Sequence, residues 1–166
     1  MDDDAAAAER PEITVAVVME RETAPNRFED WRFRIADVVP HESAFGTAAR
    51  VLRDDGKVLR TLHPNFKLAL YRDQADGYYL NLSSGAPVWF VVWRVDDAEP
   101  SKAWPETVSL SYTEAGRWLD AQERVDNVPL AGELVAWLQA YTDEHYRPEP
   151  KKRRRPQSFV APEDRR

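Results

Sequence analysis

A short, strongly apolar run over residues 88–92, followed by Trp93, constrains the fold more than any other feature of the chain. The run reads Val-Trp-Phe-Val-Val and comes directly after a cluster of turn-forming residues at 81–87. A β-branched and aromatic run that is entered from a turn is typical of a buried strand. We therefore expect this segment to form a strand at the centre of a folded core.

The length and the residue types set limits on the class of protein. A chain of 166 residues suits one domain with tails, and it is long enough to bury a hydrophobic core without disulfides. It has no cysteine, which excludes disulfides, thiolate metal ligands and cysteine nucleophiles. The acidic start, Met1-Asp2-Asp3-Asp4, lacks the positive charge and the apolar stretch of a secretory signal. No apolar run approaches the roughly 20 residues of a membrane helix, so we expect a cytoplasmic protein.

The charge is divided unevenly along the chain. Residues 147–166 carry eight cations and three acids, a net charge of +5, which leaves −11 for the remainder of a chain whose total is −6. An acidic body with a basic end is typical of a protein with an interaction arm. We expect a disordered acidic leader over residues 1–12, a single β-rich domain over 13–146 and a flexible basic tail over 147–166.

Alternating apolar residues and turn signals predict a chain rich in short strands. Asp54-Asp55-Gly56 separates two alternating segments and predicts a hairpin, because these residue types tolerate positive φ. Pro64-Asn65 is interpreted as a break between two further strands. Strands are expected over residues 13–19, 31–35, 49–53, 57–62, 66–70, 88–95, 107–112 and 125–128.

Three segments have helical signals. Residues 73–82 are expected to form a helix with Asp73 as its N-cap, although Gly77 weakens it by roughly 1 kcal/mol. A second helix of about two turns is expected to begin near Thr113. Pro129 is expected in the first turn of a C-terminal amphipathic helix that closes at Tyr146, roughly 25 Å long. The predicted fold is α+β: a mainly antiparallel sheet or partial barrel of about seven strands, with the C-terminal helix packed on it.

The sequence contains no recognisable catalytic, cofactor or metal site. The histidines, His41, His63 and His145, are far apart and lack the spacing of metal ligands. Ser83 and Ser84 do not lie in a nucleophile elbow, and the six glycines do not cluster into a phosphate loop. Paired acids such as Asp54 and Asp55 lie at predicted turns and are interpreted as solvated residues. We therefore expect a protein that is not an enzyme and has no cofactor.

Two features are candidates for partner binding. Trp104 lies in a predicted loop, where it either contributes to a protein interface or anchors the loop. The other candidate is a basic run whose cations could attract a protein partner or nucleic acid, or dock on the chain's own acidic body. The run consists of Lys151, Lys152, Arg153, Arg154 and Arg155. Nucleic acid is disfavoured because the body is acidic and no aromatic residues interleave with the run.

A third possibility is a small-ligand carrier. In a partial barrel, aromatic side chains could surround a flat molecule such as a pterin. The residues considered for this lining are Trp89, Trp93, Phe90 and Tyr79.

Several segments of the chain form a pattern through their order and spacing. They are residues 15–21 with 26–33, residues 78–87, and residues 125–129 followed by Trp137, His145 and the basic run 151–154. Together, over residues 13–155, they resemble the DUF3305 family of proteobacteria. The chain departs from the family pattern at Phe28, where tryptophan is usual, and at 147–150, where an aromatic residue often precedes the basic run.

The resemblance implies a protein without an assigned activity whose relatives are often encoded near molybdenum-dependent formate dehydrogenases. It implies an accessory, assembly or structural role, with a formate dehydrogenase subunit or one of its maturation factors as the protein partner. Some relatives are labelled as acting in molybdopterin-guanine dinucleotide synthesis. That label does not fit these residues, because the chain has no glycine-rich nucleotide loop.

Overall fold

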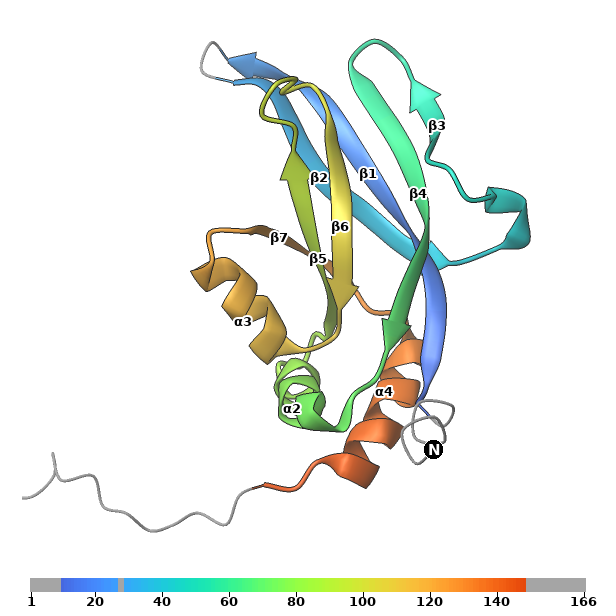
Figure 1. Ribbon diagram of the computed structural model, residues 1–166, viewed down its shortest axis with the longest axis vertical. Coiled ribbons are helices and arrows are strands. Elements are labelled where there is room, and N and C mark those ends of the chain that lie inside the picture. Colours follow the sequence, from blue (N-terminus) through green and yellow to red (C-terminus); the bar gives the residue numbers. More distant parts are fainter. Residues whose placement is uncertain (1–9, 27–28, 149–166) are drawn as a thin grey trace, which may run out of the picture.

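The computed structural model describes residues 10–26 and 29–148 (Figure 1). These residues form seven strands, three α-helices and two short 3-10 helices. The strands are β1 (Glu12–Asn26), β2 (Glu29–Pro40), β3 (Arg50–Asp54), β4 (Val58–Ala69), β5 (Val88–Val95), β6 (Ala103–Ser109) and β7 (Arg124–Pro129). The helices are α2 (Ala75–Ser83), α3 (Tyr112–Asp120) and α4 (Gly132–His145), with 3-10 turns η1 (Ser43–Phe45) and η2 (Arg72–Gln74).

The strands form two antiparallel sheets that face each other. The larger sheet has the order β2-β1-β4-β3, and the smaller has the order β6-β5-β7. Strand β2 lies beside β7, and β4 lies beside β6, so the edges of the two sheets approach each other (Figure 1). Within the described residues no hydrogen-bonded ladder joins the sheets into a closed barrel. The predicted α+β fold with a mainly antiparallel sheet is confirmed, and the partial barrel takes the form of two facing sheets.

The core lies between the sheets because alternate residues of each strand point to the same face. In β1 the inward residues are Val15, Val17 and Met19, and in β5 they are Trp89 and Val91, all at most 4% exposed. Val108, Val128 and Leu138 add to the same cluster from β6, β7 and α4. The apolar run over residues 88–92 therefore lies in β5, the central strand of the smaller sheet.

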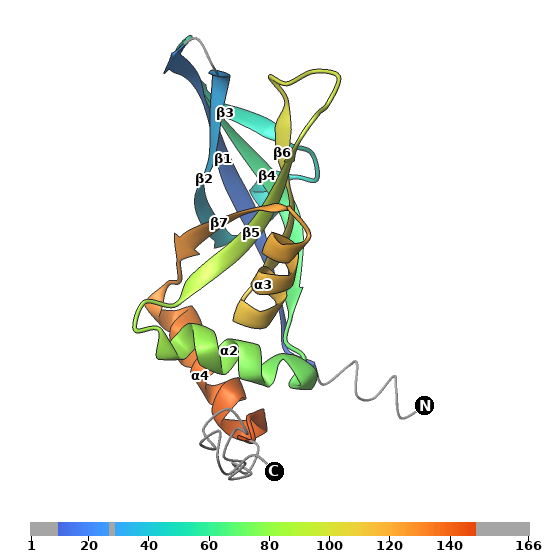
Figure 2. The ribbon, with the colours of Figure 1, turned by 90° about the vertical axis from the view of Figure 1, so that its left-hand side faces the viewer.

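The helices close one end of the space between the sheets. Helices α2 and α4 pack against each other below the strands, and Figure 2 shows them crossing at that end. Tyr78 of α2 and Tyr141 of α4 meet edge to face, with ring centroids 6.0 Å apart. Helix α3 lies on the outer face of the smaller sheet, where Tyr112 contacts Phe90. The predicted C-terminal helix is present, although it is 14 residues long and begins later than expected.

The interpretation of Pro64-Asn65 as a break is wrong, because β4 continues through both residues. Val15 pairs with Phe66 and Val17 pairs with His63, so β4 carries one extra residue between these pairs. This β-bulge accommodates Pro64, and Asn65 adopts a positive φ of 67°. A bulge and a strand end produce the same local sequence signal. Only the pairing with β1 distinguishes the two.

Three further element boundaries differ from the prediction. Asp73 lies inside η2 and is not an N-cap; Gln74 occupies that position and makes no side-chain capping bond. Tyr112 begins α3 and does not end a strand, because Ser111 caps the helix by accepting a hydrogen bond from the Glu114 N–H at 3.2 Å. Pro129 is the last residue of β7 and lies before α4.

Gly77 is required at the contact between α2 and α3. A Cβ at this position would lie 2.0 Å from Ser111 Oγ, so no larger residue fits without a shift. The Ser111 hydroxyl is already engaged: it caps α3 and donates a 2.7 Å hydrogen bond to Gln74 Oε1. The glycine that weakens the isolated helix therefore allows two helices to pack closely.

Asn81 connects three parts of the fold through one buried amide. Its Nδ2 donates hydrogen bonds of 2.9 Å to the carbonyls of both Val88 and Leu110, and its Oδ1 accepts one of 3.0 Å from the Val88 N–H. The side chain is 2% exposed, so these backbone groups cannot turn to water instead. Asn81 thereby fixes the end of α2 to the start of β5 and to the segment after β6.

Candidate functional site

Trp104 lies in strand β6 and not in a loop, which corrects the prediction. It pairs with Arg94 of β5, and its indole Nε1 donates a 3.0 Å hydrogen bond to Glu106 Oε2. Pro105 suggested a loop, but β6 is an edge strand with a register shift between Val92 and Trp93 on its partner. Edge strands and bulges tolerate proline, so this signal did not exclude a strand. The side chain is partly exposed.

A groove of about 330 Å³ opens beside Trp104, between the larger sheet and the β6 side of the smaller sheet. We call it the Trp104 groove. Its walls are largely apolar, and cations and a histidine lie among them. The lining residues are Met19, Arg21, Phe33, Leu59, Thr61, His63, Ser101, Lys102, Ala103 and Trp104.

The side chain of Arg21 crosses the space between the sheets next to this groove. Its Nη1 donates a 3.0 Å hydrogen bond to the Ser101 carbonyl, and its guanidinium lies 4.4 Å from the centroid of the Trp31 ring. Phe33 packs against Trp93, with ring centroids 5.9 Å apart. Arg21 and Phe33 thus bridge the sheets at the end away from the helices.

A second cleft of about 360 Å³ lies on the β2 and β7 side of the same end. Phe33 lines both openings and therefore contributes to the wall of each. The second cleft is lined by Asp30, Trp31, Arg32, Phe33, Trp93, Val95, Pro100 and Arg124. Its aromatic rings come from both sheets.

Asp126 holds the two sheets together close to these openings. Its Oδ1 accepts a 3.0 Å hydrogen bond from the Trp93 Nε1, and its Oδ2 accepts one of 2.9 Å from the backbone N–H of Ile35. Ile35 adjoins the register shift where β2 pairs with Met19 of β1. The carboxylate therefore satisfies an N–H of the irregular strand and fixes the indole of Trp93.

His63 faces the Trp104 groove from β4. Burial disfavours the imidazolium and lowers the pKa of His63 from its ordinary value. The groove consequently has a neutral imidazole in its wall near neutral pH, and its positive charge comes from Arg21 and Lys102.

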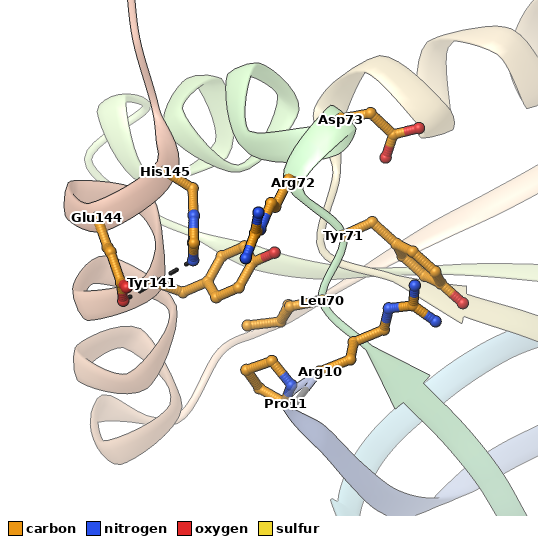
Figure 3. A pocket seen from close by; sticks show the side chains of 9 residues that line it. All are labelled: Arg10, Pro11, Leu70, Tyr71, Arg72, Asp73, Tyr141, Glu144 and His145. Carbon is orange, nitrogen blue, oxygen red and sulfur yellow. Dashed lines mark ion pairs between the residues drawn. The ribbon is translucent and has the colours of Figure 1, made fainter. Parts of the chain in front are cut away.

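A larger cleft, of about 510 Å³, lies at the opposite end of the molecule (Figure 3). We call it the Arg72 cleft. It is formed where the start of β1, the segment around η2 and the last turn of α4 meet. Its lining residues are Arg10, Pro11, Leu70, Tyr71, Arg72, Asp73, Tyr141, Glu144 and His145.

No local sequence pattern predicts the Arg72 cleft. The predicted leader over residues 1–12 overlaps the fold, because Glu12 begins β1 and the Pro11 carbonyl accepts a 2.9 Å hydrogen bond from the Leu70 N–H. Arg10 is placed by this pairing, with its guanidinium 4.5 Å from the Tyr71 ring centroid. The contributing segments are distant in the sequence, and no local pattern links them.

The aromatic residues considered for a ligand cavity do not come together. Trp89 is 1% exposed within the packed core, whereas Phe90 points to the opposite face of β5 and contacts Tyr112. Tyr79 is 43% exposed and stacks on Tyr146 with ring centroids 4.2 Å apart. Of the set, Trp93 lines a cleft. A cavity formed by these four side chains is therefore wrong.

The basic run from Lys151 to Arg155 lies outside the described residues, so its role stays a prediction. In residues 10–26 and 29–148, no group of three or more histidine or acidic side chains is arranged to hold a metal ion. No helix in the described part of the chain is long and apolar enough to cross a membrane.

The fold and its clefts define an α+β protein of two facing antiparallel sheets with helices at one end. A protein-family model described as "Protein of unknown function (DUF3305)" matches residues 14–155, and the chain belongs to this family. The expected family membership is thereby confirmed. No curated protein and no solved structure shows significant similarity to the chain.

Proposed function

We propose that this protein is a non-catalytic accessory protein of the cytoplasm that acts by binding a protein partner in the Trp104 groove. The partner we propose is a subunit of a molybdenum-dependent formate dehydrogenase or one of its maturation factors. The partner's identity rests on the family resemblance and its association with such genes. The place of binding rests on the structure of the groove.

The observation that carries the proposal is an apolar groove that residues 10–26 and 29–148 leave open. Met19, Phe33 and Leu59 face it from the larger sheet, and Trp104 lies at its other wall. Tryptophan and arginine are enriched among the residues that contribute most to protein interfaces. A groove with one partly exposed indole and a neighbouring guanidinium suits the insertion of an apolar side chain.

The charges around the groove indicate what should flank that side chain. Arg21 and Lys102 line it, and burial keeps His63 neutral near neutral pH. Complementary charge steers encounter and selects partners. We therefore expect a partner segment that carries an apolar anchor beside an acidic residue.

A retention assay with purified components tests the proposal. The wild-type protein is immobilised, and candidate dehydrogenase subunits and maturation factors are passed over it at low and high salt. We expect retention of one of them, and a Trp104→Ala variant should bind roughly 30-fold more weakly, since loss of an interface anchor costs about 2 kcal/mol. Leu119→Ala is the matched control, because Leu119 is 57% exposed on α3 and does not line the groove.

The two parts of the proposal fail in different ways. If no candidate is retained at either salt concentration, the accessory role with this enzyme is wrong. If a candidate is retained equally by the wild-type and Trp104→Ala proteins, the partner is correct and the groove is wrong.

A small-ligand carrier is the second candidate, supported by the cleft on the other side of Phe33. The rings of Trp31, Trp93 and Phe33 line that opening, and aromatic rings suit a flat molecule such as a pterin. Quenching of tryptophan fluorescence by a pterin, lost in Trp93→Leu, would support it. Nucleic-acid binding through residues 151–155 stays a further prediction, and unchanged nucleic-acid retention after deletion of residues 149–166 would refute it.

A further inference from the structure

Two arginines and a tyrosine from separate elements line the Arg72 cleft. Arg10 precedes β1, Arg72 begins η2 and Tyr141 lies in α4. Figure 3 shows the head of Arg72 beside the Tyr141 hydroxyl, and the head of Arg10 on the Tyr71 side of the same opening. The three side chains come from elements that are held together by the Leu70–Pro11 hydrogen bond and by the packing of α4 against α2.

Neither guanidinium is neutralised within the described part of the chain. Arg10 lies over the ring of Tyr71, and neither Arg10 nor Arg72 has a carboxylate oxygen within ion-pair distance among these residues. Both positive charges act on the Tyr141 hydroxyl: burial raises the pKa of Tyr141, and Arg72 and Arg10 oppose that rise. An arginine fork that faces a cleft without a partner is suited to an oxyanion.

The acidic residues at the rim limit the charge of the anion. Glu144 Oε2 lies 3.8 Å from His145 Nε2, and Asp73 in Figure 3 points away from Arg72. These two carboxylates would repel a phosphate dianion more strongly than a singly charged group. The local balance therefore favours a carboxylate over a phosphate.

The cleft also has apolar lining residues. These are Pro11 and Leu70, of which Leu70 is fully buried, together with the ring of Tyr141. A ligand that carries its carboxylate on an aliphatic carbon would place that carbon against Pro11 and its oxygens at Arg72. Ligand sites typically combine apolar groups with a few polar groups that fix the orientation of the ligand.

We propose that the Arg72 cleft binds a single carboxylate group, held by the guanidinium of Arg72 and the hydroxyl of Tyr141, with the positive charge of Arg10 on the other side of the opening. The ligand class is an aliphatic carboxylate, provided either by an acidic side chain or by the C-terminal end of a peptide. The Trp104 groove lies at the other end of the fold, so this site is independent of the proposed function.

The test is an NMR titration of the full-length protein with small probes. Acetate and acetamide have the same shape and differ in charge. We expect acetate to shift the side-chain Nε–H signals of Arg10 and Arg72 in a saturable way, and acetamide to leave them unchanged. Two larger probes separate the sources: N-acetylglutamic acid α-amide presents a side-chain carboxylate, and N-acetylalanine presents a chain end. The tighter of the two identifies the source.

Variants connect the signal to the cleft. Arg72→Ala should weaken acetate binding at least tenfold, and Arg72→Lys should weaken it less, because lysine keeps the charge but loses the fork. Arg117→Ala, an exposed arginine on α3, is the matched control and should bind as the wild type does.

Three outcomes would overturn the assignment. One is a linear shift of the Arg10 and Arg72 signals that does not saturate with acetate. Another is unchanged binding in an Arg72→Ala protein whose thermal unfolding shows that it is folded. The third is tighter binding of inorganic phosphate than of acetate, which would assign the cleft to a different class of anion.

Discussion

Replacing Asn81 by alanine should remove much of the stability of this fold. The buried amide makes three hydrogen bonds to backbone groups of Val88 and Leu110, each between 2.9 and 3.0 Å. Alanine leaves one N–H and two carbonyls without these partners, and an unsatisfied buried group costs about 1–3 kcal/mol. Carbonyls retain a second lone pair and some relaxation follows, so we expect a total loss of about 3–5 kcal/mol. The total free energy of unfolding of a natural domain is about 5–15 kcal/mol.

Urea unfolding, followed by tryptophan fluorescence, measures this loss. The urea concentration at the midpoint of unfolding should fall. The slope of the free energy of unfolding against urea concentration should stay the same, which indicates that the unfolded state is unaltered. Near neutral pH, Asn81→Asp should be at least as unstable as Asn81→Ala, because a carboxylate cannot donate hydrogen bonds to the carbonyls of Val88 and Leu110. Part of that loss should be recovered in acid, where the protonated side chain can donate again.

The control for Asn81 lies on the same helix. Ser83 donates a 2.7 Å hydrogen bond to the Tyr79 carbonyl in an exposed position, so Ser83→Ala should change the free energy of unfolding by no more than about 0.5 kcal/mol. If the free energy of unfolding of Asn81→Ala lay within about 1 kcal/mol of the wild-type value, this amide would not join α2 to the smaller sheet as described.

Three further perturbations test other parts of the fold. Gly77→Ala should destabilise the protein by about 2 kcal/mol in urea unfolding, because the new Cβ displaces the Ser111 cap, and Ser111→Gly in the same chain should recover part of the loss. Asp126→Ala should cost about 2 kcal/mol and alter the emission of Trp93, since the hydrogen bond to Ile35 that joins the sheets and the one to Trp93 within the smaller sheet are both lost; equal stability would contradict this bridge. His63 has a lowered pKa in the folded state, so the unfolded chain binds its proton first as the pH falls. Stability should therefore decrease below about pH 6.5, by at most about 1.4 kcal/mol per pH unit, and His63→Gln should reduce this slope.

The sequence predicts those parts of the fold in which local signals and tertiary packing agree. Residues 88–95 form β5 with the expected bounds, because a β-branched run between turn residues has no competing interpretation. The hairpin at Asp54-Asp55-Gly56 is confirmed as well. Asp55 accepts hydrogen bonds from the Lys57 and Val58 N–H groups there, and these bonds, with Arg53, lower its pKa to about 2. Asp55 is exposed to solvent, as predicted for an acid at this turn, and it also stabilises the turn through these hydrogen bonds.

The remaining features depend on contacts between distant segments. A proline followed by an asparagine occurs both where a strand ends and where a strand contains a bulge. At Pro64-Asn65 the pairing of β1 with His63 and Phe66 shows that it is a bulge. Gly77 weakens a helix when it is considered alone, and the need for it is visible only where α2 meets Ser111. The Arg72 cleft depends even more on contacts between distant segments, since no spacing in the sequence connects Arg10 with Tyr141.

The distribution of helices explains why the Trp104 groove lies where it does. Helices α2 and α4 close the lower end of the space between the sheets, with Leu138 and Tyr141 in the core (Figure 1). At the other end no helix covers the strands in the described residues, and long side chains such as Arg21 and Phe33 bridge the gap. Side chains that span a gap fill it less completely than a packed helix does, so openings remain on both sides of Phe33. Removing that ring should therefore join the two openings. A Phe33→Ala variant that bound both a partner peptide and a flat ligand no differently from the wild type would show that neither opening is a binding site.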